Sequence, residues 1–84
     1  MTQRDRILSQ ILDGRSDAKV NFNELLNLLR SLAFSERIRG SHHIFTREDV
    51  QEIMNLQPKG AKAKAYQVKQ VRQVPVKYRL GGMP

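Results

Sequence analysis

The spacing of the apolar residues changes at Phe34, and this change constrains the fold more than any other feature of the chain. Before it, apolar side chains recur at the period of one helical face: Phe22, Leu25, Leu26, Leu29 and Leu32. Asn21 precedes this run and Glu24 follows three residues later, which is the spacing of an N-cap and its capping box. After Phe34 the side chains alternate, as they do in strands. The chain therefore joins a helix directly to β-structure.

Three short strands are expected after the leucine-rich helix. Residues 36–39 and 42–46 would pair as a hairpin that turns at Gly40-Ser41, and residues 51–56 would form a third strand that ends before Pro58. Three consecutive strands between helices predict the α+β class, with a small three-stranded antiparallel sheet and helices packed on one face.

Further helices are expected at both ends of the chain. Residues 4–12 carry an apolar face, and Gly14 is the kind of residue that follows a helix end. A basic helix is expected within residues 61–80. Pro75 lies inside it and would kink the helix or end it near Val74, because proline lacks a backbone donor and clashes with the preceding turn.

The 84 residues suffice for one small domain, which we place at residues 21–80. Residues 1–20 would be an N-terminal helical extension with a linker, and residues 81–84 a flexible tail. No apolar run approaches the roughly 20 residues of a membrane span, and the chain has no cysteine. We therefore expect a cytoplasmic protein without a membrane segment.

The positive charge is concentrated at one end of the sequence. Residues 1–56 carry eight basic and eight acidic side chains, whereas residues 57–84 carry seven basic side chains and no acidic one. The net charge of +7 therefore belongs entirely to the last third of the chain. Such a segment is typical of a polyanion-binding protein. The alternative is a solubilising surface, or a patch that meets an acidic protein.

Both histidines lie in one motif, Gly40-Ser41-His42-His43-Ile44-Phe45. Histidine is the side chain best suited to proton transfer near neutral pH. Adjacent strand residues point to opposite faces, so the two cannot serve one site. We take His43, on the face of Phe45, as the catalytic candidate and His42 as structural or peripheral. The same divergence, with no cysteine present, predicts no metal site. The alternative is that His43 only packs beside Phe45 and makes one hydrogen bond.

The order of these features resembles the HicA toxin family of bacterial toxin–antitoxin systems. The resemblance spans residues 21–80 and rests on four matches: Leu25-Leu26 through Phe34, Gly40-Ser41-x-His43, the aromatic at Phe45, and Gln57-Pro58-Lys59 before the basic helix. Ala33 stands where such proteins usually have glycine, and Pro75 falls where their last helix is uninterrupted.

The resemblance implies a double-stranded-RNA-binding-like fold and a ribosome-independent mRNA interferase that a HicB antitoxin holds inactive. It also implies RNA cleavage without a metal or other cofactor, with His43 at the centre. The remaining candidates would contact the RNA: Ser41, Arg39, Lys59, Lys62, Lys64, Lys69 and Arg72.

Two other functions fit the same sequence. One is a non-catalytic RNA-binding module with the same fold and basic helix. The other is an interaction protein whose basic segment docks onto an acidic partner.

Overall fold

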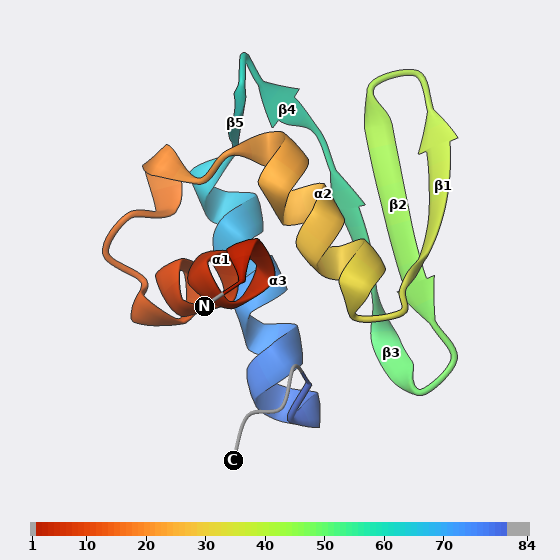
Figure 1. Ribbon diagram of the computed structural model, residues 1–84. Coiled ribbons are helices and arrows are strands. Elements are labelled where there is room, and N and C mark those ends of the chain that lie inside the picture. The colour runs from red at the N-terminus through yellow and green to blue at the C-terminus, as the bar shows by residue number, and fades with distance from the viewer. Residues whose placement is uncertain (1, 81–84) are drawn as a thin grey trace.

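The leucine-rich segment folds as a helix and the alternating segment after it as a sheet (Figure 1). The computed structural model describes residues 2–80; the tail expected at residues 81–84 lies outside them. The elements in chain order are α1 (Gln3–Asp13), the 3₁₀ turn η1 (Asp17–Lys19), α2 (Phe22–Ser31), β1 (Ser35–Arg39), β2 (His42–Arg47), β3 (Val50–Leu56), β4 (Pro58–Lys59), β5 (Lys62–Ala63) and α3 (Ala65–Tyr78).

The first three strands form an antiparallel sheet in the order β1-β2-β3, which confirms the predicted α+β class. β1 and β2 pair with Ile38 opposite His43, and the chain turns at Gly40, whose φ of 58° lies in the left-handed region. The helices lie together on one side of this sheet (Figure 1). His43, Phe45 and Met54 face that side. Phe45 and Met54 are fully buried there, so the core lies between sheet and helices.

The first helix belongs to the same core as the rest of the chain. It begins with a capping box between Thr2 and Asp5 and ends at Gly14, whose φ is 78°. Its apolar face buries Ile7 and Ile11 in the single hydrophobic cluster that also holds the leucines of α2. Residues 3–13 are therefore a layer of the fold as well as an N-terminal addition to residues 21–80.

The end of α2 is a Schellman motif with alanine in the position that favours glycine. Ala33 has a φ of 68°, its N–H donates to Arg30 O (3.1 Å), and the N–H of Phe34 donates to Leu29 O (3.2 Å). Phe34 and Leu29 are both buried, as the motif's usual apolar contact requires. This tight end directs the chain from α2 into β1. The N-cap predicted at Asn21 is confirmed, since its side chain accepts from Glu24 N–H (3.0 Å).

A second small sheet follows the third strand, where the sequence predicted no further β-structure. β4 and β5 form a hairpin that turns at Gly60, with Lys59 opposite Lys62. Its loop docks on the start of α2, because the N–H of Phe22 donates to Ala61 O (3.0 Å). Ala63 N–H in turn donates to Val20 O (2.9 Å). Two-residue strands carry too little alternation to be read from sequence.

Of the two effects predicted for Pro75, a kink or a helix end near Val74, the helix end is wrong, because α3 continues through Pro75 to Tyr78. Proline removes the hydrogen bond that its own N–H would make and crowds the carbonyl one turn before it. Val74 and Pro75 are both buried, and Pro75 O accepts the N–H of Leu80 (3.0 Å). The Tyr78 hydroxyl also donates to Glu52 of β3 (2.6 Å). Packing and these end contacts outweigh the lost bond. Within residues 2–80, no helix has the length and apolar character needed to span a membrane.

Candidate functional site

His43 lies on the helix-facing side of β2, between the sheet and the start of α2. Its ring meets the ring of Phe22 edge-on, with the ring centres 5.3 Å apart and the planes at 73°. Its Nδ1 lies 2.7 Å from Glu36 Oε2. The side chain is 18% exposed, so one side of the ring is held by the protein and part of it reaches the surface. Both partners come from elements that flank β2: Phe22 opens α2, and Glu36 lies on β1.

Glu36 is held in place by an arginine as well as by His43. Arg30, in the last turn of α2, donates from Nε to Oε1 (2.7 Å) and from a terminal nitrogen to Oε2 (2.9 Å), a two-pronged pairing. The Arg30 guanidinium lowers the pKa of Glu36 below its usual value, and His43 acts in the same direction. Glu36 is therefore ionised at neutral pH and can only accept hydrogen bonds.

This arrangement sets the tautomer of His43. Because an ionised Glu36 accepts, Nδ1 carries a hydrogen and donates it, and the lone pair of the neutral ring lies on Nε2. Among residues 2–80, Nε2 has no hydrogen-bond partner and is not buried. A histidine that a carboxylate orients at Nδ1 and that exposes Nε2 is arranged to take or give one proton at Nε2.

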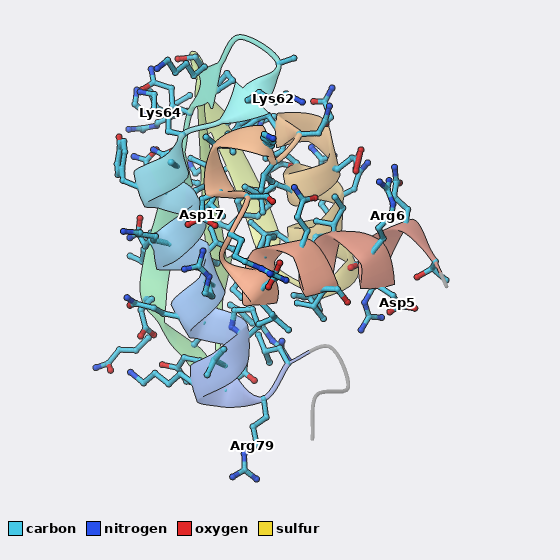
Figure 2. The ribbon with its side chains drawn as sticks, turned by 90° about the vertical axis from the view of Figure 1, so that its left-hand side faces the viewer. Asp5, Arg6, Asp17, Lys62, Lys64 and Arg79 are labelled. Carbon is cyan, nitrogen blue, oxygen red and sulfur yellow. The ribbon has the colours of Figure 1, made fainter. Side chains whose placement is uncertain are left out.

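The small hairpin carries two of the predicted lysines and docks on the start of α2, whose Phe22 contacts His43. Lys59 and Lys62 flank the loop whose Ala61 O accepts the N–H of Phe22, and the Phe22 ring contacts His43. None of the ion pairs among the described residues involves Lys59, Lys62 or Lys64. Figure 2 shows Lys62 and Lys64 at the same end of the molecule. The end of the molecule that carries the small hairpin therefore holds positive charge that no described ion pair offsets.

Ser41 and Lys64 are linked through one glutamine. Gln57 Nε2 donates to Ser41 Oγ (2.9 Å), and Lys64 Nζ donates to Gln57 Oε1 (2.9 Å). The tip of the β1–β2 hairpin is thereby tied to the start of α3. The amide is neutral, so it orients Lys64 without cancelling its charge.

Arg39 and His42 lie on the other face of the sheet. They are directly opposite one another in the β1–β2 register and one residue out of phase with His43. His42 Nδ1 contacts Asn55 Oδ1 (3.0 Å) on that face. Arg39, predicted to contact the RNA, therefore does not face the same side of the sheet as His43. The predicted divergence of the two histidines is confirmed.

The two predicted RNA contacts on α3, Lys69 and Arg72, have different surroundings. Lys69 is exposed on α3. Arg72 instead donates from Nε to Ile11 O (2.7 Å) and forms an ion pair with Asp17, so it joins α3 to α1 and η1. Its side chain is 24% exposed. We therefore give Arg72 a structural role and leave it out of the proposed RNA surface.

Sequence reasoning found no partner for His43, although part of the signal was present. A hairpin turning at Gly40-Ser41 places Ile38 opposite His43, and Glu36 is then the diagonal neighbour on the same face. Register alone thus pointed to Glu36. Nothing local pointed to Arg30, which reaches Glu36 from the other end of α2 and across the Schellman turn.

Comparison with known proteins identifies no relative: no family model matches the chain, and no curated protein or solved structure is similar enough to count as a match. Functional inference therefore rests on the geometry of the site and on the residues of the motif. Within the described part of the chain, no three side chains of the metal-binding types gather at one place.

Proposed function

We propose that this protein is a toxin-type endoribonuclease that cleaves single-stranded mRNA with His43 as its general base or acid. The observation that carries the proposal is the row Arg30–Glu36–His43, which holds one ring nitrogen and leaves Nε2 free. The order helix, three strands and helix, with the helices on one face, fits the double-stranded-RNA-binding-like fold that the HicA resemblance implies. Under the same resemblance, the protein acts in the cytoplasm, needs no metal and is held inactive by a HicB-type antitoxin.

The reaction begins with proton transfer at His43 Nε2. The nitrogen takes the proton of a ribose 2′-hydroxyl, and the oxygen attacks the adjacent phosphorus. The bond from phosphorus to the 5′-oxygen breaks, and that oxygen takes a proton from water, whose hydroxide in turn receives the proton that Nε2 holds. The products are a 2′,3′-cyclic phosphate and a free 5′-hydroxyl. Glu36 stabilises the imidazolium that forms, and Lys59 and Lys62 meet charge on the phosphoryl oxygens.

The neighbouring histidine provides a matched control for the catalytic test. We expect His43→Ala to abolish cleavage of a 5′-labelled single-stranded RNA in the presence of a chelator, and His42→Ala to leave cleavage near wild type. Glu36→Gln should lower the rate by about 10- to 100-fold, because the amide no longer stabilises the charged ring. Product ends should be cyclic phosphates, identified by mass spectrometry.

Growth after induced expression should be impaired by the wild-type protein and by His42→Ala, and it should be normal with His43→Ala. Cleavage by His43→Ala at the wild-type rate would overturn the proposal.

The packing of His43 favours one alternative, a non-catalytic RNA-binding module. Its ring rests on Phe22 and is mostly buried, as in many structural histidines. This function predicts RNA binding without cleavage by wild type and unchanged affinity in His43→Ala. Replacing Lys62, Lys64 and Lys69 together would then abolish binding.

A further inference from the structure

A cavity lies at the start of α3, and its lining has the cations and the aromatic ring that bind nucleotides. It has a volume of about 680 Å³, within the range of small-molecule sites, and is lined by Lys59, Lys64, Ala65 and Tyr66. No acidic side chain lines it. It lies in the segment from residue 57 onward that contains no carboxylate side chain.

Tyr66 is the unusual member of this lining. Its side chain is 65% exposed, although the chain has only five aromatic residues and the three phenylalanines are buried. Tyr78, the other tyrosine, is half-buried and bonded to Glu52. The other aromatic rings are therefore engaged in the core or in a hydrogen bond, whereas Tyr66 is exposed and lines the cavity together with Lys59 and Lys64. An exposed aromatic ring beside cations is the arrangement on which unpaired bases stack.

Side-chain hydrogen bonds connect the cavity to the hairpin of the catalytic candidate. Lys64 is bonded to Gln57, and Gln57 to Ser41, two residues before His43. Buried Gln67 fixes the start of α3 to the end of β3, because it accepts from Gln57 N–H (3.0 Å) and donates to Asn55 O (3.2 Å). The cavity lining is thereby fixed relative to the hairpin that carries His43.

We propose that the cavity is a subsite for one nucleotide of single-stranded RNA, whose base stacks on Tyr66 while Lys59 and Lys64 bind the flanking phosphates. The proposal rests on the nuclease function and adds a substrate requirement, namely an unpaired base beside the cleaved bond. A duplex does not meet it, because paired bases are already stacked.

Binding to a non-cleavable probe tests the subsite independently of catalysis. The probe is a fluorescein-labelled oligouridine of about 12 nucleotides with 2′-O-methyl riboses, which lack the attacking hydroxyl. We expect Tyr66→Ala to weaken binding about 10-fold with an unchanged salt slope, and Tyr66→Phe to bind like wild type. Lys64→Gln should reduce the salt slope by about 0.7. Val76→Ala is the control, since Val76 is also an exposed side chain of α3. It should bind like wild type.

Tyrosine fluorescence gives a second readout with unlabelled probe. The chain has two tyrosines and no tryptophan, so stacking on Tyr66 should quench a large part of the emission. Tyr66→Phe should bind without that quenching.

The outcomes distinguish failure of the proposed subsite from failure of the proposed nuclease function. Wild-type affinity in Tyr66→Ala, or an equal loss of affinity for duplex RNA, would overturn the subsite and leave the nuclease proposal standing. Quenching that persists in Tyr66→Phe would do the same. If wild type binds an acidic protein but no RNA at about 50 mM salt, both proposals fail.

Discussion

Replacing Ala33 with glycine should stabilise the protein. Ala33 has a φ of 68°, and the left-handed region costs a residue with a Cβ about 1–2 kcal/mol. Glycine avoids this cost but loses about 0.5–1 kcal/mol more conformational entropy on folding. The alanine side chain is exposed, so little packing is lost, and the Schellman hydrogen bonds come from the backbone. We therefore expect Ala33→Gly to raise the free energy of unfolding by about 0.5–1 kcal/mol.

The change is large enough to measure in a domain of this size. It corresponds to a rise in Tm of about 2–8 °C, followed by circular dichroism at 222 nm. Urea unfolding should show a higher midpoint with an unchanged m-value, because no additional surface is buried.

Two variants reverse the perturbation. Ala33→Val should destabilise the protein, because a β-branched side chain tolerates positive φ less well than alanine. Gly40→Ala places a Cβ at a φ of 58° where no atom lies within 4 Å, so its cost is conformational only. We expect a loss of about 0.5–1 kcal/mol. If Gly40→Ala costs this much and Ala33→Gly brings no gain, the reasoning about strain at Ala33 is refuted.

Three further changes test long-range contacts. Arg72→Met should lower the free energy of unfolding by about 1.5–3 kcal/mol, because Asp17, with a side chain 12% exposed, loses its charged partner; an unchanged urea midpoint would contradict the structural role. Gln67→Leu should cost about 2 kcal/mol or more, since it leaves two main-chain groups at the end of β3 unpaired, and Gln67→Glu should cost at least as much, because it buries a carboxylate that faces the Asn55 carbonyl oxygen. Glu36 has a lowered folded-state pKa, so its contribution to stability is complete above its ordinary pKa near 4.5 and is lost as pH falls through the lower value. Glu36→Gln should therefore flatten the acid side of the stability profile measured by urea unfolding between about pH 3 and 7, and an unaltered profile would show that the Arg30 pairing does not act on stability.

Predictions from local spacing hold where a short stretch decides the structure. The cap at Asn21, the turn at Gly40 and the opposite faces of His42 and His43 each follow from residues within a few positions of one another, and the structure contains all three. The prediction of a helix end near Val74 was wrong because it considered only the local effect of proline on the helix. Burial of Pro75 against the core and the anchoring of Tyr78 on β3 are not local properties.

The candidate site divides in the same way. Sequence identified His43 and the lysines beside it, because a motif and a run without acidic residues are visible in one dimension. It treated Arg39 and Arg72 as RNA contacts on the basis of charge alone, whereas the register turns Arg39 to the other face and packing engages Arg72. The residue type fixes the charge of a side chain, but the contacts that the fold gives it decide whether that charge is free to bind RNA.

By itself, the sequence determined the helix–strand order, the confinement of net charge to the last third of the chain, and one histidine facing the core side of a strand. These depend on residue identity and on backbone periodicity. The fold alone shows that Glu36 and Arg30 orient that histidine, that a second hairpin with two lysines docks on the start of α2, and that Tyr66 is exposed in a lining shared with Lys59 and Lys64. Those juxtapositions join segments as far apart in the chain as Phe22 and Ala61, and they exist only because burial of one shared core holds helices and sheet together.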